Sequence, residues 1–215
     1  MPIVYQQNIN DHTSLGVWNI QEEERFFLEK VSLQRDITHA HKRLQHLAGR
    51  YLLKELVPAF PAELIRIAET RKPFLEDEAY HFSISHCGDF AAVIVSSDHR
   101  VGTDIELTTE KVDRVKHKFL AHRELDLIKG LAMIPVNPGF SQILTAAWCI
   151  KESLFKWYGS GEVNFKDHLH INALQLDEAG GLAQCAFVKH GVVELPVQFI
   201  FLERNCVSWV LSAVG

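Results

Sequence analysis

The chain has 215 residues, 47% of them hydrophobic, which is enough to bury the core of one compact domain or of two small ones. Its net charge of −5 provides no basic field for wrapping nucleic acid, so an anionic partner would have to meet a local basic patch. No apolar run approaches the roughly 18 residues of a membrane helix, and the first residues lack a charged leader followed by an apolar stretch. We therefore expect a soluble, cytoplasmic monomer without a nucleic-acid or membrane partner.

The four cysteines are widely separated and form no Cys-x-x-Cys pair, which argues against a zinc knuckle and against a disulfide framework. We expect reduced thiols in a core. Two His-x-His pairs, at residues 39–41 and 168–170, have no other metal-ligating residues near them in the sequence, so solvated or singly hydrogen-bonded histidines are the favoured interpretation.

The first half of the chain predicts a helix flanked by strands. Residues 39–56 carry leucines near helical spacing and end before Pro58, a pattern typical of an amphipathic helix. Cys87-Gly88-Asp89 separates two β-branched runs, and its Gly and Asp suit a hairpin turn. The strands expected are residues 15–20, 80–85, 90–96 and 101–107.

The second half repeats the order of helix first and sheet afterwards. A helix is predicted over residues 142–158, ended by Gly159-Ser160-Gly161, with strands at residues 170–176, 183–189, 196–202 and 207–213. This order predicts an α+β protein of two similar lobes packed together, joined near residues 104–113. We place the domains at residues 1–106 and 107–215.

Residues 102–106 read Gly-Thr-Asp-Ile-Glu, so on a strand Asp104 and Glu106 point to the same face. Ionised carboxylates about 6 to 7 Å apart repel one another, and a magnesium ion relieves that repulsion. Taken alone, the pair is better explained as an exposed strand face with two solvated acids.

Glu152 and Lys156 are four residues apart on the second long helix, a spacing that predicts an ion pair worth about 0.5 kcal/mol at a surface. Trp148, one turn before Glu152, would place this polar face at the border of the core. That position favours a partly buried acid and lysine.

Ser85 and His86 lie where a strand enters a turn, where a hydroxyl and an imidazole can bind phosphate oxygens. They make a poor catalytic pair, because neighbours on a strand point to opposite faces. Arg71-Lys72-Pro73 places two cations before a rigid turn, which is equally a solvated loop.

In their order and spacing these motifs resemble the surfactin-type 4′-phosphopantetheinyl transferases of the holo-acyl-carrier-protein synthase superfamily, which carry a Gly-x-Asp-x-Glu strand and a Trp-x-x-Lys-Glu-Ser-x-x-Lys helix. Residues 102–106 and 148–156 match both signatures. The Lys-Pro turn, the Ser-His strand end and Leu47-Ala48-Gly49-Arg50 are also similar to family features, so the resemblance spans most of the chain. It implies two helix-plus-antiparallel-sheet lobes packed as an intramolecular pseudo-dimer, with the binding site between them.

The resemblance implies magnesium-dependent transfer of the 4′-phosphopantetheine group of coenzyme A to a serine of an acyl or peptidyl carrier protein, with release of 3′,5′-ADP. Asp104, Glu106 and Glu152 would hold the magnesium ion, and Glu152 would also take the serine proton. Asp104, Glu152 and Lys156 would be the catalytic residues. The remaining coenzyme A ligands would be Lys156 or Lys151 at a phosphate, Ser85 and His86 at the pyrophosphate, and Arg43, Arg50 or Lys72 at the 3′-phosphate.

Residues 111–123 contain five cations against the single acid Asp113, in a chain that is acidic overall. Apolar residues at helical spacing predict a short helix with an exposed cationic side. Because the carriers of this enzyme class are generally acidic, we expect the segment to dock the carrier, although a solvated helix face explains the pattern equally well. The docking residues expected are Arg114, Lys118, Phe119 and Leu120.

Two other functions fit parts of this pattern. A magnesium phosphohydrolase acting on a nucleotide or pyrophosphate could use the same three acids, because the metal chemistry does not distinguish water from a serine acceptor. A non-catalytic coenzyme A-binding relative is disfavoured, because Asp104, Glu106, Glu152 and Lys156 are all present at the expected spacing. The sequence does not identify the carrier or its pathway.

Overall fold

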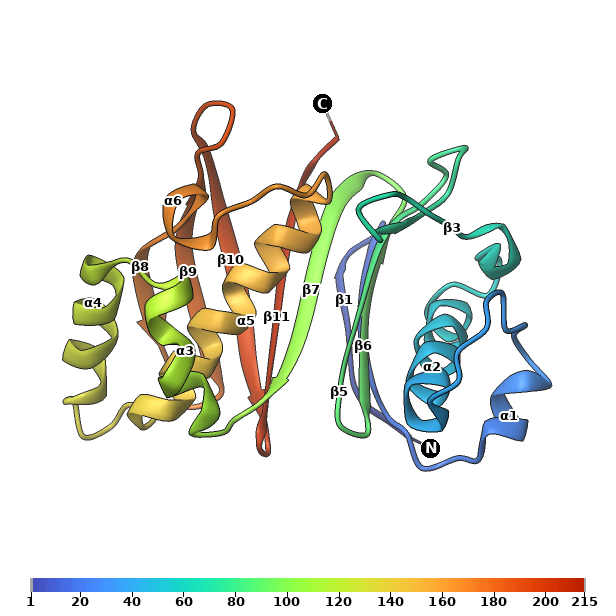
Figure 1. Ribbon diagram of the computed structural model, residues 1–215, viewed down its shortest axis with the longest axis horizontal. Coiled ribbons are helices and arrows are strands. Elements are labelled where there is room, and N and C mark those ends of the chain that lie inside the picture. Colours follow the sequence, from blue (N-terminus) through green and yellow to red (C-terminus); the bar gives the residue numbers. More distant parts are fainter. Residues whose placement is uncertain (1, 215) are drawn as a thin grey trace. The chain divides into compact units, whose positions relative to one another are not determined.

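A computed structural model describes residues 2–214, which divide into two compact units (Figure 1). The first unit runs to Val101 and includes the residues from Ala213 on, and the second is Gly102–Ser212. The division lies ahead of residue 102, earlier than the expected boundary after residue 106. The reason is that strand β7 (His99–Leu107) is hydrogen-bonded to β11 (Asn205–Ala213) in the sheet of the second unit.

The first unit is a four-stranded antiparallel sheet in the order β1-β2-β6-β5, with helix α2 packed on it. Three leucines of the α2 stripe, Leu47, Leu52 and Leu53, are buried as predicted. Gly49 allows a close approach to β5, since a Cβ there would lie 2.6 Å from Cγ2 of Ile84. The elements are β1 (Ile3–Asn10), β2 (Thr13–Asn19), α1 (Glu24–Leu28), α2 (Ala40–Leu56), the 3-10 helix Ala62–Leu64, β3 (Arg66–Ile67), β4 (Pro73–Phe74), β5 (His81–Cys87) and β6 (Phe90–Ser96).

The second unit is a five-stranded sheet in the order β7-β11-β10-β9-β8, and helix α5 packs against it. Helix α5 ends at Gly159, which adopts the left-handed conformation with φ of 73° that glycine tolerates best. Gly102 brings β7 against α5, because a Cβ there would clash with the Ser153 carbonyl and lie 2.6 Å from the Trp157 nitrogen. The other elements are α3 (Lys111–Phe119), α4 (His122–Ala132), α5 (Phe140–Tyr158), α6 (Phe165–His168), β8 (Leu169–Leu176), β9 (Gly180–Phe187) and β10 (Val193–Leu202).

The mixture of helices and antiparallel sheet confirms the predicted α+β class. The predicted hairpin is also confirmed: Cys87 pairs with Phe90 across Gly88, whose φ is 55°. Both units share one feature of connectivity. The strand that precedes the long helix (β2 or β7) is hydrogen-bonded to the strand that comes last in the chain order of the same sheet (β6 or β11). The packing of two lobes as a pseudo-dimer stays a prediction.

The short helix expected within the basic segment 111–123 is confirmed as α3. Leu120 is extended and buried, so α3 ends at Phe119 and a separate helix α4 begins at His122. The expectations also omitted β1, whose exposed and half-buried residues alternate, and α1 with five residues. Strand β1 is rich in Gln and Asn, and α1 is too short to show a helical period.

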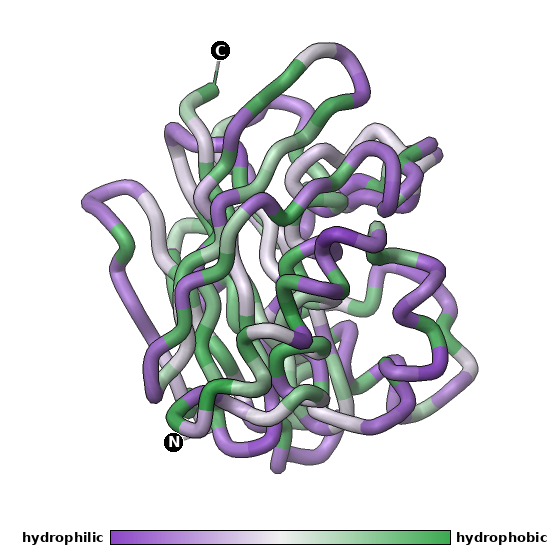
Figure 2. The backbone as a smooth tube through the Cα atoms, turned by 90° about the vertical axis from the view of Figure 1, so that its left-hand side faces the viewer, coloured by the Kyte–Doolittle hydropathy of each residue, from purple (hydrophilic) through white to green (hydrophobic). Residues whose placement is uncertain are grey.

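Hydrophobic residues concentrate in the strands and long helices, and hydrophilic ones in the loops between them (Figure 2). The four cysteines are free thiols, with Cys149, Cys185 and Cys206 buried, as expected for a reduced core. Over residues 2–214, no helix combines the length and apolar character that crossing a membrane requires.

Candidate active site

Strand β7 carries the first two acids of the site. Asp104 is only 3% exposed and Glu106 is half-buried. The alternative of two solvated acids on an exposed strand face is therefore wrong for Asp104. The strand is fixed beside them, because Thr103 donates its hydroxyl proton to the Ser208 carbonyl at 2.8 Å and Ile105 is buried. The acids therefore sit on a rigid element of the second unit.

Helix α5 presents Trp148, Glu152 and Lys156, each four residues after the one before. The Lys156 ammonium lies 2.5 Å from Oδ1 of Asp104, and the Trp148 indole donates to Oε1 of Glu106 at 3.0 Å. Lys156 thus pairs with the strand acid rather than with Glu152 one turn earlier, which corrects the ion pair that the spacing predicted. The structure brings Asp104, Glu106, Glu152 and Lys156 together from two distant segments.

Glu152 has an unusual protonation equilibrium. Burial raises the pKa of its carboxyl to about 7, and the negative charge of Asp104 adds to this rise. The Lys156 cation opposes the rise, and Glu106 adds a smaller one. Near neutral pH this carboxyl can therefore both accept and release a proton, which is a property of catalytic acids and bases.

The three carboxylates suit a hard divalent cation such as magnesium, because they supply oxygen ligands and because their mutual repulsion falls when a cation binds among them. Within residues 2–214, however, no group of three or more His, Cys, Asp or Glu side chains is already arranged to hold a metal ion. In this structure Lys156 and the Trp148 indole contact two of the acids instead. The carboxylate oxygens are ligands of the kind that magnesium prefers, although the three side chains are not oriented around one common point.

Lys151 corrects another expectation, because its side chain is 0% exposed and cannot reach a phosphate where it lies. Its ammonium donates to the Phe119 carbonyl, the Phe165 carbonyl and Oε2 of Glu124, at 2.7, 3.0 and 2.8 Å. Burial lowers the pKa of Lys151, and Glu124 opposes that shift. Glu124 was missed in the sequence; its only local signal is its place three residues after Ala121, whose backbone N–H it accepts.

In the first unit, the predicted phosphate ligands of β5 and the Lys-Pro turn differ in accessibility. Ser85 is buried, His86 is exposed, and both precede the end of β5 at Cys87. Burial, reinforced by the charge of Arg100, lowers the pKa of Lys72 to about 8. His86 and Lys72 therefore stay candidates for binding an anion.

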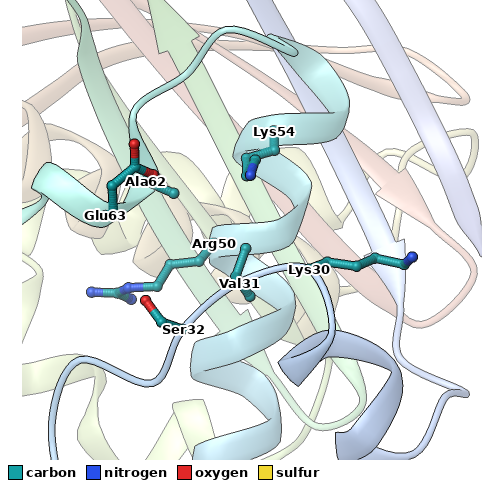
Figure 3. A pocket seen from close by; sticks show the side chains of 7 residues that line it. All are labelled: Lys30, Val31, Ser32, Arg50, Lys54, Ala62 and Glu63. Atoms are coloured by element: carbon teal, nitrogen blue, oxygen red, sulfur yellow. The ribbon is translucent and has the colours of Figure 1, made fainter.

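Arg50 lines a small cavity of about 180 Å³ in the first unit, together with Lys30, Ser32, Lys54 and Glu63 (Figure 3). Arg50 is 5% exposed, one of its Nη atoms lies 3.2 Å from Nδ1 of His46, and its Nε has no hydrogen-bond partner among the described residues. Burial and the nearby Arg35 lower the pKa of Arg50 to about 10. An anion in this cavity would compensate the crowded positive charge.

Arg43, by contrast, already has an anionic partner. Its guanidinium donates to both carboxylate oxygens of Glu24, at 2.7 and 2.8 Å, and to the Ile37 carbonyl at 2.8 Å. A phosphate would have to compete with that bidentate pair. Among the candidates for the 3′-phosphate, Arg50 therefore has the better environment.

The basic helix α3 agrees only in part with its expected docking role. Arg114 and Lys118 are exposed, and Val115 between them is 37% exposed. Phe119 and Leu120 are 1% and 4% exposed and belong to the core of the second unit, so they cannot contact a partner on this surface. Both face inward because the chain turns into the core where α3 ends.

Parts of the chain are similar to known proteins. Residues 100–193 match the family model described as the 4'-phosphopantetheinyl transferase superfamily, and this stretch contains the acids of β7 as well as α5 with Glu152 and Lys156. Together with the named relatives below, the match supports a phosphopantetheinyl transferase enzyme.

The chain is 26% identical over 188 residues to the 4'-phosphopantetheinyl transferase AcpT of Escherichia coli, covering 84% of this chain and 89% of that protein. It is 29% identical over 168 residues to the L-aminoadipate-semialdehyde dehydrogenase-phosphopantetheinyl transferase of Rattus norvegicus, with 68% of this chain and 50% of the relative covered. It is 37% identical over 129 residues to the enterobactin synthase component D of Escherichia coli, with 54% of each covered. The chain thus spans about half the length of the last two.

Proposed function

We propose that this protein is a surfactin-type transferase that moves the 4′-phosphopantetheine group of coenzyme A to a serine of an acyl or peptidyl carrier protein, with magnesium bound. One observation carries the proposal: Asp104, Glu106, Glu152 and Lys156 share a single electrostatic cluster inside the stretch that matches the transferase superfamily. A cytoplasmic location and a monomeric state stay predictions.

In the proposed reaction, the serine oxygen forms a bond to the phosphorus that carries pantetheine, and the bond from that phosphorus to the 3′,5′-ADP oxygen breaks. Glu152 accepts the serine proton as the general base; in the metal-free protein the pKa of its carboxyl is raised to about 7. Lys156 supplies positive charge against the transferring phosphoryl group. Magnesium, held by Asp104, Glu106 and Glu152, would supply further charge neutralisation at the pyrophosphate.

The rest of coenzyme A would bind to residues of the first unit. We assign the 3′-phosphate to the cavity lined by Arg50, Lys30 and Lys54, because the Arg50 guanidinium is buried there and its Nε has no hydrogen-bond partner among the described residues. We assign the pyrophosphate to His86, with Ser85 and Lys72 as further candidates. Arg43 takes the lower rank because Glu24 already binds its guanidinium.

The test is mass spectrometry of a panel of apo carrier proteins incubated with coenzyme A and magnesium. We expect a gain of one phosphopantetheine on the serine of at least one carrier, and none with the Glu152→Gln and Asp104→Ala variants, provided that circular dichroism shows both are folded. Release of an ADP-type product without carrier labelling would instead indicate the phosphohydrolase. Coenzyme A binding without either product would indicate a non-catalytic relative.

We also propose that the exposed side of α3 docks an acidic carrier through Arg114 and Lys118, with Val115 at the contact. The double charge reversal of Arg114 and Lys118 to Glu should raise the carrier KM and weaken its dependence on salt, while the coenzyme A KM stays constant. Lys129→Glu on α4 is a control for a single reversal, because it reverses one exposed cation of the same unit outside α3. An unchanged carrier KM in the double variant would refute the docking role.

A further inference from the structure

The buried Lys151–Glu124 pair is connected to several elements of the second unit at once. All three Lys151 ammonium protons have acceptors: the Phe119 carbonyl at the end of α3, the Phe165 carbonyl in α6, and Glu124 in α4. The Glu124 carboxylate also accepts the Ala121 N–H at 2.6 Å and the Ile171 N–H of β8 at 2.8 Å. Neither side chain is exposed to solvent.

The two residues whose carbonyls bind Lys151 are also the two whose rings flank Trp148. The Phe119 ring meets the Trp148 ring edge-on with centroids 4.9 Å apart, and the Phe165 ring stacks on it with centroids 5.6 Å apart. The indole held between them donates to Oε1 of Glu106. A continuous set of contacts therefore leads from the buried ammonium to an acid of the site.

We propose that Lys151 and Glu124 are positioning residues for Glu106, acting through Phe119, Phe165 and Trp148. This rests on the proposed function, in which Glu106 is an acid of the magnesium site. An ammonium group suits this position because it offers three donors from one atom, whereas an apolar side chain of the same volume would remove the donor to both carbonyls. Loss of these bonds frees α6 and the end of α3, and with them the rings that hold the indole.

The test compares the double variant Glu124→Gln/Lys151→Met with wild type. A single substitution leaves an uncompensated buried charge, whereas the double substitution removes both charges at similar volume. We expect the double variant to be folded. Its Trp148 emission, obtained by subtracting the spectrum of the same protein carrying Trp148→Phe, should differ in wavelength from that of wild type in the absence of substrate. The magnesium concentration for half-maximal transfer should rise by about 10- to 100-fold, as for other groups that orient metal ligands, with an unchanged coenzyme A KM.

Val197→Ala on β10 is the matched control, because it weakens the same core without touching this set of contacts. It should lower the melting temperature and leave both the fluorescence and the magnesium requirement at their wild-type values. A double variant with wild-type fluorescence and magnesium requirement, or a control that shifts them equally, would overturn the proposal. If no carrier is modified by wild type, the proposed function fails, while the fluorescence comparison still decides whether the pair holds the indole.

Trp148→Phe keeps the proposal testable if the double variant does not fold. It retains a smaller aromatic ring between the two phenylalanines and removes the N–H that binds Glu106. We expect a folded variant with a raised magnesium requirement. A wild-type magnesium requirement in this variant would show that Glu106 needs no indole, and the positioning role would be refuted.

Discussion

Replacing Glu152 with glutamine should stabilise the metal-free protein at alkaline pH, although it removes the proposed base. The folded protein raises the pKa of this carboxyl from 4.5 to about 7, chiefly through burial and the charge of Asp104. Because the folded state binds this proton more tightly than the unfolded state, wild type has the full benefit below about pH 4.5 and loses it as the pH rises through about 7. The rise corresponds to about 3 kcal/mol in the free energy of unfolding.

The assay is urea unfolding in the presence of a chelator, for wild type and Glu152→Gln, at about pH 4.5 and about pH 8. Titrating groups that do not interact with Glu152 contribute equally in both proteins, so their effects cancel in the difference. The variant should gain up to about 3 kcal/mol relative to wild type between the two pH values. Added magnesium should stabilise wild type at about pH 8 more than the variant. A difference that does not change with pH would refute the claim that the surroundings of Glu152 raise the pKa of its carboxyl.

Three further outcomes are expected. Lys156→Met should lower kcat by about 10²- to 10³-fold. It should also move the rising limb of the pH–rate profile to higher pH, because the Lys156 cation lowers the pKa of Glu152. An unchanged pH–rate profile would contradict this. Gly102→Ala should lower the free energy of unfolding by about 3 kcal/mol, because its Cβ would clash with α5. Gly130→Ala on α4, whose Cβ would meet no atom within 4 Å, should be neutral or stabilising in the same urea unfolding assay. Arg50→Met should raise the KM for coenzyme A but not that for its 3′-dephospho analogue, and equal effects on both would exclude the 3′-phosphate from the Arg50 cavity.

Local patterns in the chain were sufficient for the regular elements. The leucine spacing of α2, the Gly-Asp turn of the β5–β6 hairpin and the glycine at the end of α5 each depend on residues close in sequence. Such signals survive without knowledge of the rest of the fold. The end of α3 at Phe119 was not predictable in this way, because the turn at Leu120 is stabilised by burial in a distant core.

The candidate site divides in the same way. The residue types and spacings at 102–106 and 148–156 identified the candidate acids and lysines of the site. The periods of strand and helix predicted which of these side chains lie on one face of β7 or of α5. The spacing could not distinguish the roles of Lys151 and Lys156, which lie on the same helix: Lys151 is enclosed by Glu124 and two carbonyls, whereas Lys156 reaches Asp104.

By itself, then, the sequence determined most helices and strands, their order and the chemical class of the site, because each of these depends on short-range periodicity and motif spacing. Only the tertiary structure decided which charges pair, that Phe119 and Leu120 are buried, and that Glu124 takes part at all. Burial and ion pairing arise from contacts between segments far apart in the chain, such as α4 with α5 or β7 with α5, and no local pattern specifies which side chains will meet there.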